Sequence, residues 1–243
     1  MTYTGISLPD SETNFLMFLR MVHLVAGFVW LGLLYFFNLV NVPFMKELDA
    51  PTRAKITPGL MLRALWWFRW AAVVTVLAGL AYWGQIVATD ARVAGEAPTQ
   101  PLVSFLVVWT ATWGILYALL LPGKGLLDKG WVLAILFTAI VAHSVRFFLH
   151  WNGGRWESNR LLAIGIGGGL GWMMMLNVWG VIWRIQKRLI AWTKASAENG
   201  TPMPEQAQRM ARMAFLVSRT NAYLSIPMLF FMAAASHYPM FVG

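Results

Sequence analysis

The sequence contains no cysteine. This absence excludes disulfides, thiolate metal ligands, iron–sulfur clusters and covalent attachment of a c-type haem within the chain. Acidic residues are also scarce, since only 10 Asp and Glu occur in 243 residues and none lies inside a long apolar segment. A proton relay or ion pathway built on buried carboxylates is therefore not expected, because such pathways place acidic residues at membrane depth. Any redox centre held by this chain has to use its histidines.

Charged residues are few and apolar residues dominate. Hydrophobic residues make up 58% of the chain and charged residues 12%, whereas a soluble domain carries about a quarter charged residues. The composition therefore predicts an integral membrane protein. Its net charge of +9 is interpreted as topology signals and headgroup anchors, with no role in nucleic-acid binding. Segment 1–14 lacks the Lys or Arg that begins a cleavable signal peptide, so the first span is expected to remain in the mature protein.

Six apolar segments are long enough to span a bilayer, which takes about 20 residues. They predict an all-α fold, a polytopic bundle of about six transmembrane helices that forms a single domain over residues 1–243. The expected spans lie near 15–44, 65–87, 102–121, 131–151, 161–183 and 213–239. In the loop 187–212, a turn at 199–204 is expected to separate two short amphipathic helices that lie at the headgroups.

Basic residues are concentrated in alternate connections. The rich connections hold Lys46, Arg53, Lys55 and Arg63, then Lys124 and Lys129, then Arg184, Lys187, Arg188, Lys194, Arg209 and Arg212. The other connections hold Arg92, and Arg155 with Arg160. The positive-inside rule places the rich connections in the cytoplasm. Both termini are then outside, and the expected location is the cytoplasmic (inner) membrane of a bacterium.

Two of the expected spans carry a histidine and an arginine three residues apart. Arg20 precedes His23 in the first span, and Arg146 follows His143 in the fourth. Since these spans run in opposite directions, both histidines lie about 13 Å below the outer surface, and both arginines lie closer to it. A haem iron accepts two neutral imidazoles, and haem propionates need cations or water. The pattern predicts haem b with His23 and His143 as axial ligands, and with Arg20 and Arg146 near the propionates.

Three further residues are candidates for cofactor contact. Gly27 lies one turn after His23, and His150 and His237 lie in the outer half of the membrane. A second haem between His150 and His237 is one interpretation, and solvated surface histidines are the other. Histidines inside spans can also bridge helices by hydrogen bonds, and an arginine such as Arg20 can reach the headgroups alone.

The fifth span opens with glycines, and the last span contains a proline. Gly165, Gly167, Gly168, Gly169 and Gly171 are typical of close helix contact, and a porphyrin lying against the glycine face is the sharper interpretation. Pro227 is expected to kink the last span and free a carbonyl, a weak indication of a cofactor or quinone pocket.

Three stretches resemble a known family. They are His23–Asn38, Gly171–Arg188, and Ser218–Pro227 together with Ser236–Pro239, and they are similar to the membrane domain of the bacterial urate hydroxylase (urate oxidase N-terminal) family. The resemblance implies a helical membrane domain, often followed by a c-type cytochrome domain, that passes electrons from an oxidised substrate to the respiratory chain. It implies histidines at the positions of Gly165 and Thr220, whereas His23 and His237 match.

The family's cytochrome c domain is expected to be missing, because the sequence has no Cys-x-x-Cys-His motif. The main functional hypothesis is a membrane b-type cytochrome subunit with one or two haems. It would carry electrons between an outward-facing partner, such as a c-type cytochrome or a dehydrogenase, and quinone. Two alternatives remain open: a urate hydroxylase-like oxidase of a small heterocycle at an outward pocket, and a membrane anchor without a cofactor.

Overall fold

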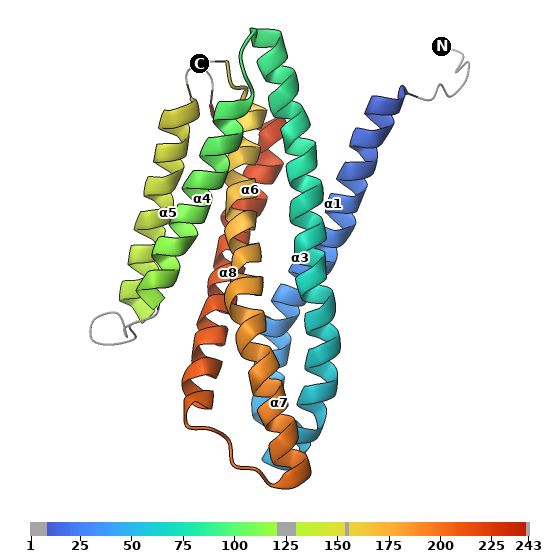
Figure 1. The fold of residues 1–243 in the computed structure, drawn as a ribbon, viewed down its shortest axis with the longest axis vertical. Coiled ribbons are helices and arrows are strands. Elements are labelled where there is room, and N and C mark those ends of the chain that lie inside the picture. The colour runs from blue at the N-terminus through green and yellow to red at the C-terminus, as the bar shows by residue number, and fades with distance from the viewer. Residues whose placement is uncertain (1–8, 121–129, 154–155, 242–243) are drawn as a thin grey trace.

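The computed structural model describes residues 9–120, 130–153 and 156–241. Lys124, Lys129 and Arg155, which entered the topology argument, lie outside these ranges. The described chain is helical throughout and contains no strand, so the all-α prediction is confirmed (Figure 1). The elements are α1 (Ser11–Tyr35), the π-helix η1 (Phe36–Asn41), α2 (Val42–Glu47), α3 (Ala50–Ala94), α4 (Thr99–Leu120), α5 (Gly130–Asn152), α6 (Asn159–Asn177), the π-helix η3 (Val178–Ile182), α7 (Trp183–Asn199) and α8 (Gln206–His237).

Five helical segments are long and apolar enough to cross a membrane: Ser11–Glu47, Ala50–Ala94, Thr99–Leu119, Gly130–Asn152 and Asn159–Asn199. They contain four of the first five expected spans in full, and the third as far as Leu119. The sixth expected span is helical from residue 213 to His237 in α8, but α8 is not among these five segments. Asn221 and Ser225 make α8 more polar, and both side chains are fully buried inside the bundle.

The start of α1 and the end of α8 lie at the same end of the bundle, which we call the termini end (Figure 1). The opposite end, called the basic end, carries Lys46 and Arg53 near the start of α3 and Lys187 in α7. The positive-inside rule predicts that the basic end is cytoplasmic.

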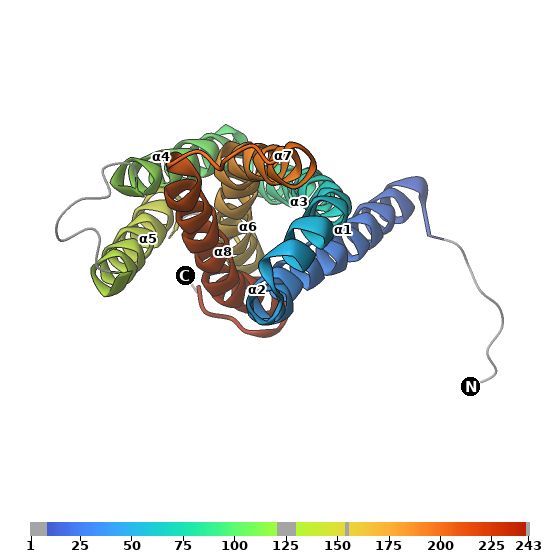
Figure 2. The ribbon, with the colours of Figure 1, turned by 90° about the horizontal axis from the view of Figure 1, so that it is seen from below.

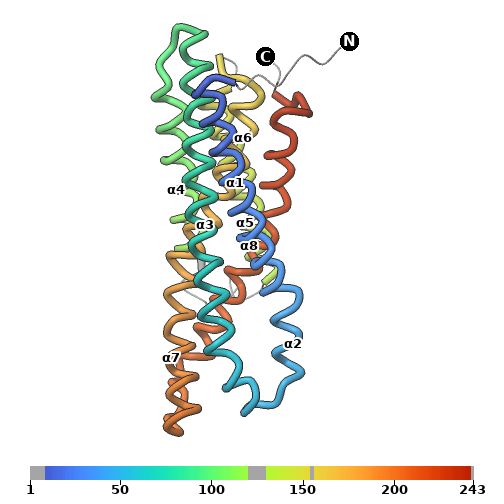
Figure 3. Tube along the Cα trace, turned by 90° about the vertical axis from the view of Figure 1, so that its right-hand side faces the viewer, coloured from blue at the N-terminus to red at the C-terminus, as the bar shows by residue number. Residues whose placement is uncertain are grey.

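The predicted turn at 199–204 lies between α7 and α8, but the two short helices expected on either side of it are parts of longer helices. The helix that begins with α6 continues through η3 and α7 to Asn199, and it ends at Gly200, whose φ of 67° is left-handed. α7 therefore extends the span along the bundle axis (Figure 3). No glycine or proline interrupts residues 183–199, so nothing ends the helix before Gly200.

α6 lies at the centre of the bundle and packs on α3, α4, α5 and α8 (Figure 2). Its glycines make these contacts close. A Cβ added at Gly169 would lie 2.0 Å from the Trp109 side chain, and one at Gly165 would lie 2.6 Å from Phe148. A Cβ added at Gly167 would lie 3.1 Å from the Met228 carbonyl oxygen of α8. The prediction of close helix contact is confirmed, and the rings against the described glycines are the protein's own aromatic side chains.

Polar side chains add hydrogen bonds between helices. The Trp83 Nε1–H of α3 donates to the Leu161 carbonyl of α6 at 3.0 Å. The Thr112 hydroxyl of α4 donates to Ser144 Oγ of α5 at 2.7 Å. Apolar burial gives helices little reason to associate inside a bilayer, so such bonds and close packing hold the bundle together.

Gly169→Ala tests the packing around α6. The added methyl group overlaps the Trp109 ring, and overpacking of this kind costs about 1–3 kcal/mol, so the thermal unfolding midpoint in detergent should fall. Gly114→Ala in α4 is the matched control, because nothing lies within 4 Å of its added Cβ. Equal midpoints for the two variants would contradict the described contact.

Candidate functional site

α1 and α3 pack side by side as an antiparallel pair, and this pair positions the histidine and arginine of the first span (Figure 1). Side-chain contacts with α3 are spaced along α1 and its continuation η1, from the termini end to the basic end. They join Arg20 to Tyr82, His23 to Thr75, Phe37 to Phe68, and Asn41 to Met61.

His23 lies against the backbone of α3. Its Nδ1 is 2.7 Å from the Thr75 carbonyl oxygen, and since a carbonyl only accepts, Nδ1 carries the proton. In the neutral ring, Nε2 then keeps its lone pair. Gly79 makes room for the imidazole, because an added Cβ would lie 2.7 Å from Nδ1. Metal-binding histidines commonly have one ring nitrogen held by a carbonyl in this way.

The structure does not bring His143 to His23. His143 and Arg146 are exposed on α5, which packs on α4 and α6, whereas α1 packs on α3 and α8. Figures 1 and 2 show α1 and α5 on opposite sides of the bundle. One iron shared by His23 and His143 within a single chain is therefore wrong. Two histidines at equal depth can share an iron only if their helices are neighbours, and α1 and α5 are not neighbours.

The remaining predicted residues are also separate. His150 is exposed on α5 and His237 is exposed at the end of α8, and neither makes a described hydrogen bond. Gly27 packs on α3, where an added Cβ would lie 3.6 Å from Thr75 Cγ2. Within the described residues, no three His, Asp or Glu side chains form a group that could hold a metal ion.

Arg20 has a different partner from the one expected. Its Nε donates to the Tyr82 hydroxyl of α3 at 2.8 Å. Nη2 of Arg160, at the start of α6, donates to the same hydroxyl. Both guanidinium groups also lie near the Tyr82 ring, with their carbons 4.9 and 5.4 Å from its centroid. We call these three residues the arginine cluster. It lies in the termini half of the bundle, one turn from His23.

A cavity of about 800 Å³ lies in the basic half of the bundle. Most of its lining comes from η1, α3, α7 and α8, with Val42 of α2, Ile182 of η3 and residues 203–205 before α8. The polar and apolar lining residues differ in exposure. Arg53, Glu205 and Gln208 are exposed, whereas Phe37, Phe68 and Ile182 are buried. The volume falls in the range of about 300–1,000 Å³ that is common for ligand pockets. The cavity therefore offers a polar entrance and an apolar interior.

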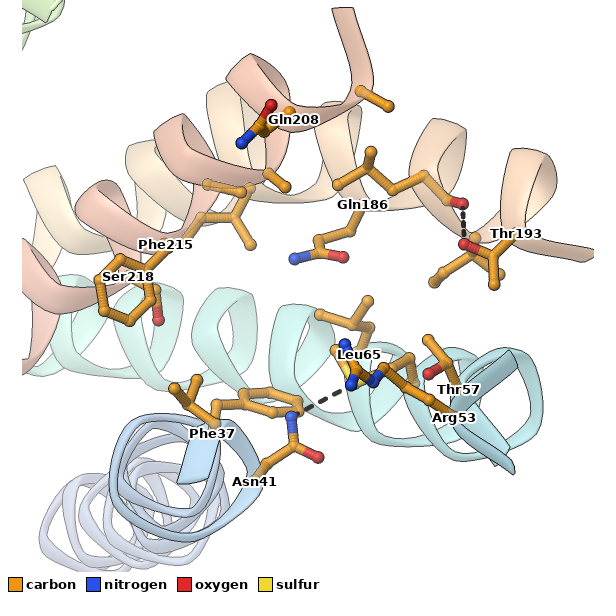
Figure 4. Close-up of a pocket in the computed structure, with 18 of the residues that line it drawn as sticks. Phe37, Asn41, Arg53, Thr57, Leu65, Gln186, Thr193, Gln208, Phe215 and Ser218 are labelled. Atoms are coloured by element: carbon orange, nitrogen blue, oxygen red, sulfur yellow. Dashed lines mark hydrogen bonds between the residues drawn. The ribbon is translucent and has the colours of Figure 1, made fainter. Parts of the chain in front are cut away.

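Two buried asparagines of η1 line this cavity (Figure 4). Asn38 is 5% and Asn41 9% exposed, and neither Oδ1 has a hydrogen-bond partner. The Asn38 amide nitrogen donates to the Leu34 carbonyl and to Ser218 Oγ. The Asn41 nitrogen lies 3.9 Å from Met61 Sδ. A buried acceptor without a donor costs about 1–3 kcal/mol, and π-helical turns such as η1 are frequent at functional sites.

In Figure 4, the polar side chain of Gln186 extends into the cavity from α7. On α8, Ser218 accepts from Asn38 Nδ2 at 3.0 Å, and Phe215 adds an aromatic ring to the lining. No described hydrogen bond occupies the Gln186 amide, so it can both donate and accept. The cavity lining thus offers both acceptors and donors of hydrogen bonds to a ligand.

An asparagine network joins three helices beside η3. Trp113 Nε1 of α4 donates to Asn177 Oδ1 at 3.0 Å, and Asn177 Nδ2 donates to Asn221 Oδ1 at 2.7 Å. Asn221 Nδ2 then donates to the Met174 carbonyl at 3.0 Å. Unlike Asn38 and Asn41, both of these side chains use their oxygen and nitrogen within the protein, so the network supports the fold.

Sequence reasoning missed Asn38, Asn41, Tyr82 and Arg160 as site residues. A usable signal existed for the asparagines, because a polar residue inside an apolar span has to find a partner. No comparable signal marked Arg160, which was assigned to a connection between spans. Its contact with Tyr82 depends on how α3 and α6 pack.

The fold and the site define a polytopic helical membrane protein with a polar-mouthed cavity between four helical segments. A family model described as "Urate oxidase N-terminal" matches residues 48–243. The chain belongs to this family, as the resemblance predicted. No curated protein and no solved structure matches the chain. The matched range includes α3, α7 and α8 of the cavity and His237, and it leaves out α1 with Arg20 and His23.

Gly79→Ala tests the placement of His23. The added methyl group should displace the imidazole and break its bond to the Thr75 carbonyl, at a cost of about 1 kcal/mol for the bond. In protein labelled with ¹⁵N at the imidazoles, the signal of the Nδ1-protonated form should weaken. Gly84→Ala on the same helix has nothing within 4 Å and should keep the signal. An unchanged signal in Gly79→Ala would contradict the described geometry.

Proposed function

We propose that this chain is the membrane subunit of an oxidoreductase of the urate hydroxylase type, in the cytoplasmic membrane of a bacterium. Its substrate, a flat heterocycle with several ring N–H groups, would bind in the cavity at the basic end. The observation that carries this proposal is the pair of buried, unpartnered amide oxygens on Asn38 and Asn41.

The chemistry of a urate-like ligand matches the lining of the cavity. Its ring N–H groups would donate to the two asparagine oxygens, and its carbonyl groups would accept from Gln186. The exposed Arg53 guanidinium at the mouth would attract an anionic form of the ligand, since one described bond, to the Leu48 carbonyl, leaves most of its donors unused. Phe37 and Phe68, which pack edge to face on each other with centroids 5.4 Å apart, would supply apolar contact to the ring.

The exposed polar mouth favours a water-soluble ligand that enters from the aqueous side. This site lies at the basic end, so it differs from the outward pocket expected from the sequence. Oxidation of such a heterocycle releases electrons, and another subunit, such as a c-type cytochrome, would carry them toward quinone or the respiratory chain.

The substrate site is tested by titrating urate into the protein in lipid nanodiscs and following the heat of binding. Asn41→Leu keeps a similar volume and removes the acceptor oxygen, so we expect the affinity for urate to fall roughly tenfold, or about 1.4 kcal/mol. Asn152→Leu is the control, because Asn152 is also fully buried but bonds Ser104 of α4, away from the cavity.

Urate affinity that is equal in Asn41→Leu and the unchanged protein would refute the cavity as the site. No urate binding by the unchanged protein would refute the substrate class.

His23 supports a second candidate function, a haem-carrying electron-transfer subunit. The chain's residues fit a haem in part, since Nδ1 is held by Thr75 and Nε2 is left to bind iron, while no second described histidine lies opposite. A haem at His23 would supply one-electron redox chemistry. Within the chain, His23 would hold the iron and Thr75 would orient the ring.

A visible spectrum of the purified protein tests the haem proposal. We expect a Soret band that is lost in His23→Ala, because the imidazole would be the protein's ligand to iron. His143→Ala should keep the band, since His143 is exposed on the other side of the bundle. Full haem content in His23→Ala, or no Soret band in the unchanged protein, would exclude this function.

A further inference from the structure

The arginine cluster places two positive charges beside one neutral phenol. Arg20 comes from α1, Tyr82 from α3 and Arg160 from α6, and both arginines donate to the same hydroxyl oxygen. A hydroxyl oxygen has two lone pairs, so these bonds use its accepting capacity. Most of the guanidinium N–H donors remain available, and Arg160 Nε is buried without any partner.

No described ion pair joins Arg20 or Arg160 to a carboxylate, and Glu157, three residues before Arg160, has both carboxylate oxygens buried without a hydrogen-bond partner. The described ion pair joins Lys194 and Glu198, and Asp90, near the end of α3, accepts instead from the Ser158 hydroxyl at 2.5 Å. Two like charges that meet in a helical membrane bundle repel each other, and the repulsion is greatest where water is scarce. An anion between them would remove this repulsion.

The cluster lies toward the termini end of the spanning helices, where a bilayer crossed by these helices would place lipid headgroups. Arg160 is the second residue of α6, close to the level where α4 begins and α5 ends. Arg20 is exposed, and α1 leans away from the bundle toward the termini end (Figure 1). The α1 side chains of Phe18, Met21 and Leu24 are 61%, 47% and 50% exposed. Cations at the polar boundary therefore adjoin a surface that acyl chains can cover.

We propose that Arg20 and Arg160 bind the phosphate of a phospholipid in the leaflet at the termini end. Each guanidinium presents paired donors that match two phosphate oxygens. Tyr82 is a positioning residue, because its hydroxyl holds the two arginines together. An anionic phospholipid is favoured over a zwitterionic one, since two cations face the headgroup. The recognised chemistry is an oxyanion, which free phosphate shares, and this proposal does not depend on the substrate proposed for the cavity.

The proposal is tested by native mass spectrometry of the detergent-solubilised protein, titrated with phosphatidylglycerol, phosphatidylcholine or inorganic phosphate. We expect phosphatidylglycerol to bind at least tenfold more tightly than phosphatidylcholine. Arg20→Gln and Arg160→Gln should each weaken binding of phosphatidylglycerol about tenfold. Arg146→Gln is the matched control, because Arg146 is exposed on α5 and lies outside the cluster. The affinity of this variant for phosphatidylglycerol should equal that of the unchanged protein.

Tyr82→Phe separates positioning from charge. It keeps the ring and both arginines but removes the shared hydroxyl, so phosphatidylglycerol binding should weaken while some preference over phosphatidylcholine remains. Equal binding by the unchanged protein and the Arg20→Gln, Arg160→Gln double variant would overturn the proposal. Inorganic phosphate that binds as tightly as the lipid would also overturn it, in favour of a free-anion site.

Discussion

The close approach of neighbouring helices to α6 is the contact on which the rest of the bundle depends. Gly167 lets the backbone of α8 come near, and Gly165 and Gly169 accept the rings of Phe148 and Trp109. Side chains at these positions would push the helices apart. The hydrogen bond between Asn177 and Asn221 needs this short separation, and it fixes α8 beside the π-helical turn that leads into α7. The wall of the cavity therefore depends on glycines well away from it.

The two asparagine pairs show how one residue type serves two purposes in the same membrane domain. The amides of Asn177 and Asn221 have hydrogen-bond partners in each other, in Trp113 and in the Met174 carbonyl, and these bonds stabilise the fold. Asn38 and Asn41 keep their oxygens unpartnered beside a cavity, which costs stability in the protein alone. A cost of this kind is expected where a ligand completes the missing bonds. The π-helical turn η1 puts both side chains on the cavity wall.

Much of the fold could be predicted from hydropathy, because apolar runs mark the part of each helix that lies in lipid. Hydropathy does not mark where a helix ends, so the fifth span was expected to end near residue 183, although its helix continues through η3 and α7 to Asn199. Depth could also be counted along the chain, but the sequence does not say which spans are neighbours. His23 and His143 were paired for that reason, whereas His23 packs on α3, and the partner of Arg20 proved to be Tyr82.

The length of α3 links the two sites described above. At 45 residues it measures about 67 Å, more than twice the hydrocarbon thickness of about 30 Å. Its first half lines the cavity through Met61 and Phe68, and Tyr82 lies about 21 Å further along the same rod. Because one continuous helix carries Met61, Phe68 and Tyr82, a rigid tilt of α3 that widened the cavity would also displace Tyr82 relative to α1 and α6. A ligand that changed the tilt of α3 at the cavity would thereby alter the arginine cluster as well.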